Sequence, residues 1–250
     1  MRAVALESVT VENDLGRVVV RDVSLTVEAG ESVALIGHNG GGKTTILRLA
    51  AGLGAPTSGV VRTLGVDLST ASYAERRQHH LAVGFVFELG GLLANRTVYD
   101  NVSLPLAYHR ADASPRRVDA RVRSIAAELG IADDLDTPSF RVNASVRKRA
   151  LFARALVLEP RLLLCDEPQI GLTAREASKV ARAVAERVKQ GMTVVFADHD
   201  GLLDPYTVDR VLYVENGQIL ARPSAAPPPD RDDPERPSMY GAGVVVGETP

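Results

Sequence analysis

The sequence of 250 residues contains no tryptophan and only one cysteine, Cys165. One cysteine cannot form an internal disulfide, so the chain is not a disulfide-stapled secreted domain. Cys165 belongs to the apolar segment 162–165, which predicts a buried strand in a reducing compartment. No apolar run approaches the roughly 18 residues that cross a bilayer, and Glu7 and Glu12 interrupt any signal-peptide core. We therefore expect a cytoplasmic chain, with no membrane path of its own.

An excess of positive charge is also missing. The formal net charge is −2, with 29 basic and 31 acidic residues. Proteins that bind nucleic acid neutralise phosphates with lysine and arginine and usually carry a basic surface. The sequence therefore predicts no nucleic-acid partner. Its length allows one α/β domain with a sizeable core and is too short for two such domains.

Alternating and continuous apolar patterns predict the architecture. Residues 2–12 and 18–27 are rich in valine with partial alternation, which favours antiparallel strands with one wet face. The segment from about 97 to 158 has a helical pattern. Shorter buried-strand patterns occur at 32–36, 82–87, 161–166 and 193–197. The alternation of strands and helices predicts an α/β fold with a parallel sheet.

The end of the chain differs in composition from the rest. Asn216 and Gly217 separate two apolar segments, which predicts a hairpin, since Asn-Gly suits a tight turn with positive φ angles. Half of the 14 prolines lie from Pro223 onward, among Asp, Arg, Ser and Gly. We expect the folded domain to comprise residues 1–221, and residues 222–250 to be a tail that is disordered or docks on a partner.

A glycine-rich loop between a predicted strand and a predicted helix has the pattern G-x-x-x-x-G-K-[ST]. It consists of Gly37, His38, Asn39, Gly40, Gly41, Gly42, Lys43, Thr44 and Thr45. Glycines let such a loop wrap a phosphate, while its N–H groups and the helix N-terminus attract negative charge. Lys43 is predicted to reach the β- and γ-phosphates, and the Thr44 hydroxyl to ligate Mg²⁺. An ordinary glycine-rich turn would not need this lysine and threonine in register.

Carboxylates and a histidine follow two of the predicted strands. Asp166 and Glu167 come where the strand 161–166 ends, and His199 follows the strand 193–197. Ligand chemistry in open parallel sheets occurs at the carboxyl ends of the strands. We predict that Asp166 holds the Mg²⁺ shell, that Glu167 is the general base for an attacking water and that His199 senses the γ-phosphate. Taken alone, Asp-Glu-Pro could be a solvated turn and the histidine structural, but their order after the loop favours the catalytic interpretation.

In this order, the motifs resemble those of ABC transporter ATPases, from the opening strands to the terminal hairpin. The resemblance implies a P-loop NTPase with a RecA-like core, an antiparallel β subdomain and a helical subdomain inserted at about 89–158. It also implies ATP and Mg²⁺ as ligands, and a second ABC ATPase subunit that completes a head-to-tail dimer. The further partner would be an integral membrane permease, which holds the chain on the inner face of the cell membrane.

Residues 90–106 resemble the transporter-facing part of the helical subdomain, and their sequence is most similar to that of the ATPases of Mla/Mce-type lipid trafficking systems. That similarity implies a phospholipid or another lipid as cargo. A lipid-shuttle substrate-binding protein would then be a further partner of the transporter.

The chain departs from the family at the signature L-S-G-G-Q, where it has Val142, Asn143, Ala144, Ser145 and Val146. Asn143, Ala144 and Ser145 thus form a degenerate signature. If either missing glycine needs a left-handed backbone, an L-residue there costs roughly 1–2 kcal/mol and weakens closure around ATP. Asn143 is nevertheless a good helix N-cap, so a helix end that meets phosphate is retained in this prediction.

Three further departures concern the nucleotide site. Glu88 follows Phe87 where the family has glutamine, Leu15 stands where an aromatic residue often stacks on adenine, and Thr173 replaces an aspartate. Glu88 is either an altered Mg²⁺ ligand or a brake, because like charges about 4 Å apart repel by roughly 1–4 kcal/mol. Two hypotheses remain open: an ATPase subunit in a homodimer or heterodimer, and a regulatory subunit that binds ATP and hydrolyses it poorly.

Overall fold

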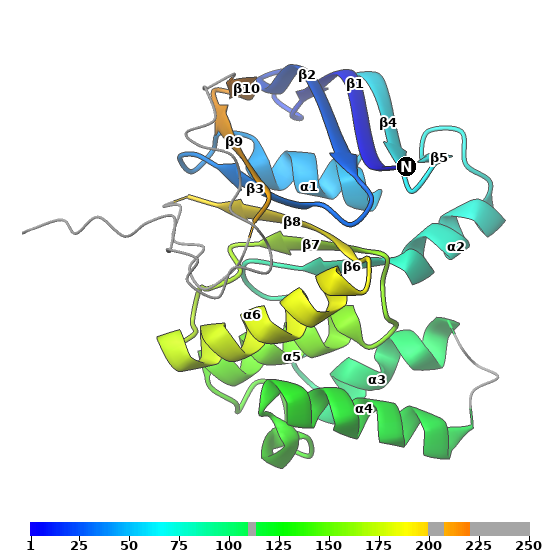
Figure 1. The fold of residues 1–250 in the computed structure, drawn as a ribbon, viewed down its shortest axis with the longest axis vertical. Coiled ribbons are helices and arrows are strands. Elements are labelled where there is room, and N and C mark those ends of the chain that lie inside the picture. Colours follow the sequence, from blue (N-terminus) through cyan, green and yellow to red (C-terminus); the bar gives the residue numbers. More distant parts are fainter. Residues whose placement is uncertain (110–113, 200–207, 221–250) are drawn as a thin grey trace, which may run out of the picture.

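Two β-sheets and the helices around them form the fold (Figure 1). The computed structural model describes residues 1–109, 114–199 and 208–220. The predicted tail at 222–250 and the expected domain end at 221 lie outside the described residues.

The first sheet is antiparallel, with strand order β2-β1-β4-β5. Its strands are β1 (Arg2–Glu12), β2 (Val18–Glu28), β4 (Ser58–Thr63) and β5 (Val66–Asp67). The antiparallel pairing of the two valine-rich segments is confirmed, and Leu6 lies opposite Leu25 in the register. Along β2, Val23, Leu25 and Val27 are buried while their neighbours are more exposed, as alternation predicts. The sequence analysis did not predict β4 or β5.

The second sheet has six strands in the order β10-β9-β3-β8-β7-β6. They are β3 (Ser32–Ile36), β6 (Val83–Val86), β7 (Leu162–Asp166), β8 (Thr193–Asp198), β9 (Arg210–Glu215) and β10 (Gln218–Leu220). All neighbours pair in parallel except β9 and β10, which form the predicted hairpin at Asn216 and Gly217, with φ of 51° and 78°. Because β3, β8 and β7 are parallel neighbours, their carboxyl ends meet at one edge of the sheet.

Helices cover both faces of the parallel sheet. Helix α1 (Lys43–Ala51) lies between the two sheets, with Ile46 and Leu47 buried (Figure 1). The other face is covered by α5 (Ala144–Leu156) and α6 (Ala174–Lys189), and α3 (Val98–His109), α4 (Pro115–Leu129) and the short η1 (Ala132–Asp134) lie beyond them. The predicted helical segment at 97–158 is therefore divided into separate helices. None of the helices in the described part of the chain is long and apolar enough to cross a membrane.

Helix α2 (Tyr73–Ala82) was not predicted from the sequence. Its first turn carries a capping box, in which the Ser72 hydroxyl accepts from the Glu75 N–H at 3.3 Å and the Ser72 N–H donates to Glu75 Oε2 at 2.8 Å. The pattern S-x-x-E is the signal that could have located this helix. Because α2 ends at Ala82, the strand expected at 82–87 is shorter than predicted and spans Val83–Val86.

His79 makes the stability of this region sensitive to pH. The ring is 2% exposed, and neither ring nitrogen has a hydrogen-bond partner of normal geometry within the described residues. Burial lowers the pKa of His79 to about 4, although the nearby Ala50 carbonyl opposes part of this effect. The unfolded chain, with a histidine pKa of about 6.5, binds the proton first, so the stabilising effect of neutral His79 is complete above that pH and is lost toward pH 4.

We expect the His79→Leu variant to lose less stability than the wild type on acidification. The wild type should lose about 1–2 kcal/mol more of its free energy of unfolding than the variant between pH 7.5 and 5, because one group contributes up to about 1.4 kcal/mol per pH unit. Urea unfolding at both pH values measures this difference. The neighbouring exposed His80, replaced by Gln, is the matched control. Equal pH dependence in His79→Leu and wild type would refute this assignment.

Candidate nucleotide site

The loop of residues 37–45 connects β3 to α1 and needs glycine for steric reasons. Gly42 is the N-cap of α1 with φ of 103°, in the left-handed region. A Cβ on Gly42 would lie 2.9 Å from the Val19 carbonyl oxygen, and one on Gly37 would lie 2.0 Å from that of Val214. The loop is therefore pressed against β2 and β9, an approach that only glycine permits.

The Lys43 ammonium is held inside this loop. Lys43 is 5% exposed, and its Nζ donates to the carbonyl oxygens of Gly37 at 2.5 Å and His38 at 3.0 Å. A pocket beside the loop is lined by residues 39–45 together with Val19, Glu88 and Glu167. This places a buried cation and a row of loop N–H groups at a concave surface that suits a polyphosphate.

Thr44 and Asp166 form a pair of oxygen donors next to the loop. The Thr44 hydroxyl donates to Asp166 Oδ1 at 3.1 Å, and Asp166 is 4% exposed at the end of β7. Burial raises the pKa of Asp166 above its usual value, while the hydrogen bond from Thr44 opposes the rise and the charge of Glu88 adds to it. A hydroxyl and a carboxylate in contact are donors that Mg²⁺ prefers, so this pair fits the ion.

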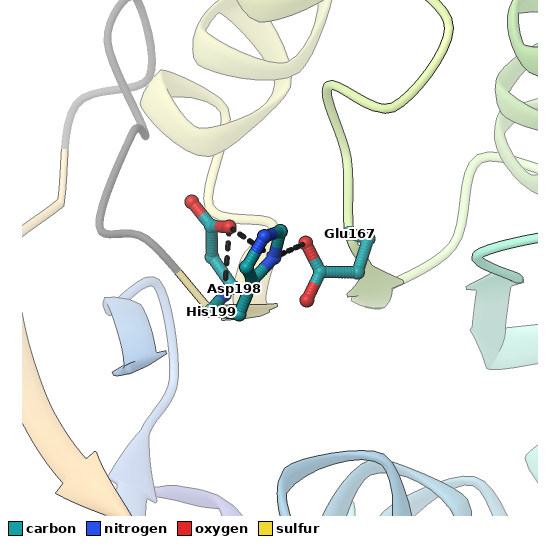
Figure 2. A group of neighbouring side chains, drawn as sticks. All are labelled: Glu167, Asp198 and His199. Atoms are coloured by element: carbon teal, nitrogen blue, oxygen red, sulfur yellow. Dashed lines mark hydrogen bonds and ion pairs between the residues drawn. The ribbon is translucent and has the colours of Figure 1, made fainter. Parts of the chain in front are cut away.

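Glu167 and His199 directly follow the adjacent parallel strands β7 and β8, and their side chains point toward each other (Figure 2). Glu167 Oε2 lies 2.9 Å from His199 Nδ1, and Glu167 is 6% exposed. Glu167 also has a φ of 48°, a left-handed conformation that costs a non-glycine residue about 1–3 kcal/mol and is concentrated at functional sites. Its N–H donates to the Ala197 carbonyl at 2.9 Å, which holds this backbone in place.

Asp198 lies in the same cluster, and the sequence analysis assigned it no role. Its Oδ1 accepts from the His199 N–H at 2.8 Å and lies 3.7 Å from His199 Nδ1 (Figure 2). Burial raises the pKa of Glu167; the nearby Asp198 carboxyl raises it further and His199 opposes the rise. The position of Asp198 directly before His199 is the only sequence signal for it. The side-chain direction that brings the two carboxyl groups together depends on the folded register of β7 and β8.

Comparison with known proteins identifies the family to which this arrangement belongs. The family model described as ABC transporter matches residues 20–170 of the chain. The chain belongs to the ABC transporter family. The ATPase domain of this family is a P-loop NTPase, and the described fold agrees, with an α/β core, an antiparallel sheet and a helical part.

Two curated ABC relatives illustrate the range of the similarity. The lipoprotein-releasing system ATP-binding protein LolD of Geobacter metallireducens is 36% identical over 211 residues, which cover 81% of this chain and 90% of LolD. The macrolide export ATP-binding/permease protein MacB of Salmonella typhimurium is 32% identical over 210 residues, covering 83% of this chain. The matched part is only 32% of MacB, so this chain spans about a third of that protein's length.

A solved ABC cassette shares the fold over most of the chain. The dimeric ATP-binding cassette MJ0796, in a post-hydrolysis state bound to ADP and Pi, has a TM-score of 0.81 and 25% sequence identity. The similarity covers 86% of this chain and 96% of the cassette. ATP and Mg²⁺ are therefore the ligands that the loop, Lys43 and the Thr44–Asp166 pair fit.

The segment 142–146, which stands where the family signature is expected, leads into helix α5. Asn143 is the N-cap with φ of −71°, its Oδ1 accepts from the Val146 N–H at 2.9 Å, and the helix starts at Ala144. The cap predicted at Asn143 is thus present. None of the positions 142–146 has a positive φ, so the strain considered for the missing glycines does not arise in this structure.

The structure does not bring the signature segment to the nucleotide loop of the same chain. Ala144 instead lines a separate groove, together with Glu88 and Leu89. Leu15 is 81% exposed. Thr173, where the family resemblance leads one to expect aspartate, is the N-cap of α6, and its N–H and its hydroxyl both donate to Glu176 Oε2, at 2.9 and 2.7 Å. The threonine therefore has a local structural reason, which is the start of α6.

Proposed function

We propose that the chain is the ATP-hydrolysing subunit of an ABC transporter, which couples ATP binding and hydrolysis to transport by a separate membrane permease. The observation that carries the proposal is one arrangement at the carboxyl ends of β7 and β8. There, Asp166 accepts the hydrogen bond of Thr44, and Glu167 contacts His199, beside the loop that holds Lys43. Substitution of Lys43 and Glu167, treated in the Discussion, tests it directly.

In this proposal each residue has a physical task. N–H groups of the loop 37–45, together with the Lys43 ammonium, bind and orient the β- and γ-phosphates, while the N–H groups of Gly37 and Gly41 donate to carbonyl oxygens of the protein. Thr44 and Asp166 hold Mg²⁺, which when bound neutralises charge on the phosphates. Glu167 accepts the proton of the attacking water, and His199 orients the Glu167 carboxylate and contacts the γ-phosphate. The metal ligand Asp166 and the general base Glu167 are thus neighbouring residues at the end of β7.

We also propose Glu88 as part of the Mg²⁺ shell. It is exposed and lines the nucleotide pocket, and its negative charge contributes to the raised pKa of Asp166. A third carboxylate here repels the phosphates unless Mg²⁺ stands between them. ATP binding should consequently depend more steeply on Mg²⁺ concentration than in a Glu88→Gln variant. Equal Mg²⁺ dependence in the two proteins would exclude Glu88 from the metal shell.

The permease is proposed to dock on an apolar groove beside the helical part of the domain. Leu89, Leu92, Phe140, Ala144 and Leu151 contribute to its lining. Leu89 is 74% and Phe140 57% exposed, which leaves large apolar side chains uncovered in the isolated chain. The resemblance of residues 90–106 to the transporter-facing segment of ABC ATPases supports this location. It also supports a place on the inner face of the cell membrane.

A Phe140→Asp variant is expected to lose the membrane partner, because a charge would have to be buried where an aromatic ring packs. Affinity purification from detergent-solubilised membranes of the source organism should recover at least about ten-fold less integral membrane protein, since ten-fold corresponds to about 1.4 kcal/mol. Tyr73→Asp is the control, because Tyr73 is 79% exposed on α2, outside the groove. Binding of Mg-ATP to the soluble variant should stay unchanged. Recovery equal to wild type would place the interface elsewhere.

A lipid is the cargo class that we propose, together with a lipid-shuttle protein. Support comes from the similarity of residues 90–106 to Mla/Mce-type ATPases and from the relative LolD, which is named for lipoprotein release. The same purified complex should contain bound phospholipid by mass spectrometry. Recovery with a soluble-metabolite permease and no lipid would contradict the proposal.

A hydrolysis-poor ATP-binding subunit is the second candidate, and the degenerate signature favours it.

The composition of the dimer is a separate question. ABC cassettes pair as dimers, as in the dimeric MJ0796 structure. With Asn143, Ala144 and Ser145 in place of the usual residues, the chain is proposed to form its active site with a second ABC ATPase subunit of ordinary signature. Sedimentation with ATP tests this pairing. Self-association indicates a homodimer, and a monomer that pairs only with another ATPase indicates a heterodimer.

A further inference from the structure

Lys148 is a buried lysine that the proposed reaction does not use. It lies on α5 and is 3% exposed, although lysine is rarely buried without a partner. Its Nζ donates to the carbonyl oxygens of Phe87 at 3.0 Å, Glu88 at 3.3 Å and Asp166 at 3.1 Å. The three acceptors come from two chain segments, one after β6 and one at the end of β7. A single ammonium therefore joins α5 to both.

The environment of Lys148 is negatively charged. Asp166, Glu167 and Glu88 all interact electrostatically with the ammonium. Burial lowers the pKa of Lys148 to about 8, and the acidic groups around it oppose that fall. Its three hydrogen bonds go to neutral carbonyl groups rather than to a carboxylate, so its positive charge acts on all three acids together. Loss of that charge would leave a concentration of negative charge at the strand ends.

Lys148 also lies between two concave surfaces. Glu88 lines the nucleotide pocket and also the apolar groove, and Lys148 lines the groove while contacting Asp166. Phe87 and Glu88, here called the Glu88 segment, lead from β6 toward the helical part of the domain. Its backbone is held by Lys148 at two consecutive carbonyls, those of Phe87 and Glu88. A displacement of this segment away from β7 would therefore lengthen its bonds to Lys148.

We propose that Lys148 is a positioning residue, which fixes the Glu88 segment against Asp166 and supplies the positive charge that allows a carboxylate at position 88. The inference rests on the proposed ATPase function for its activity readout. It goes beyond that function because it pairs the charge of Lys148, on α5, with the carboxylates proposed to bind Mg²⁺. A lysine with a purely structural role would be needed equally with either residue at position 88. A charge-compensating lysine would be needed much less once Glu88 is neutral.

The test is a double-mutant comparison with Lys148→Gln, Glu88→Gln and the two combined. Gln at position 148 removes the charge and keeps hydrogen-bond donors. Lys148→Gln should lower kcat for ATP hydrolysis at least about ten-fold and raise the Mg²⁺ concentration for half-maximal activity, a barrier change of about 1.4 kcal/mol. Adding Glu88→Gln should restore most of the loss. Lys148→Arg should retain activity, and Lys179→Gln, an exposed lysine on α6, is the neutral control.

Thermal unfolding provides a second readout, independent of turnover. Glu88→Gln should raise the Tm of Lys148→Gln by several degrees more than it raises that of wild type. If Lys148→Gln is insoluble, a soluble double variant supports charge compensation and an insoluble one contradicts it. A wild type without ATPase activity would refute the proposed function, and the Tm comparison would still decide the role of Lys148. Equal effects of Glu88→Gln in both backgrounds would overturn the inference.

Discussion

Glu167→Gln is expected to lower kcat for ATP hydrolysis by about 10²- to 10³-fold, with the Kd for Mg-ATP changed by less than about three-fold. The substitution removes the base and preserves the shape of the side chain. An amide oxygen can still accept a hydrogen bond from His199, whose Nδ1 lies 2.9 Å from Glu167 Oε2. The strained backbone at Glu167, with φ of 48°, is common to both proteins. The loss should therefore appear in turnover and not in binding.

Steady-state phosphate release by the complex with its membrane partner measures this effect. Glu186→Gln is the matched control, because the Glu186 side chain is 58% exposed on α6 and forms an ion pair with Lys189. Its kcat should equal that of wild type. A Glu167→Gln variant with kcat within about three-fold of an active wild type would mean that another group serves as base, and Asp198 would be the next residue to replace.

Lys43→Ala is expected to weaken Mg-ATP binding by at least about 10- to 100-fold, since charge-assisted hydrogen bonds contribute about 1.5–3 kcal/mol each. The ammonium is already directed into the loop by the Gly37 and His38 carbonyls. Alanine leaves those oxygens facing the phosphate without a cation. Replacement should therefore remove attraction and expose repulsion at once.

Fluorescence titration with a nucleotide analogue compares Lys43→Ala with Lys189→Ala, whose side chain is 64% exposed in its ion pair with Glu186. The control should bind as wild type does. Together, the two catalytic-site variants separate the candidate functions. If transport in the reconstituted system fails with both variants, hydrolysis drives it. If transport fails only with Lys43→Ala, the chain is the regulatory subunit that binds ATP and hydrolyses it poorly.

Much of the site follows from local sequence, for a physical reason. The role proposed for the loop 37–45 depends on its backbone and on Lys43 and Thr44, so the spacing of residues is enough to predict it. Asp166, Glu167 and His199 follow parallel strands, whose carboxyl ends must meet at one edge. The resulting contact of Glu167 with His199 lies between residues distant in sequence. The pattern of strands therefore predicted a cluster of side chains that no single motif contains.

The features that were missed depend on side-chain direction or on short elements. Lys148 appears as an ordinary basic residue near the start of a helix. Its burial becomes clear only from the packing of α5 against β6 and from the bond of Lys148 Nζ to the Asp166 carbonyl in β7. Asp198 is similar, because its proximity to Glu167 depends on the twist and register of β7 and β8. Helix α2 has few apolar residues, which hid its period, although the Ser72 and Glu75 capping box marked its start.

In the signature segment, the structure answers a question about the backbone that residue type alone left open. Glycine in the family sequence raised the question of left-handed conformations at positions 144 and 145. In this chain both positions lie in the first turn of α5, with Asn143 as N-cap. Helical backbone accepts Ala and Ser without strain, so these two residues do not strain the backbone of this chain.

Calorimetric titration of the purified wild-type chain with ATP, with and without Mg²⁺, tests the central claim most directly. If residues 37–45 bind the triphosphate and Thr44 and Asp166 bind Mg²⁺, each chain should bind one ATP. The binding should weaken strongly when EDTA removes the metal and when Lys43 is replaced by Ala. Absence of Mg²⁺-dependent uptake, even when the membrane partner and a second ATPase subunit are present, would contradict it.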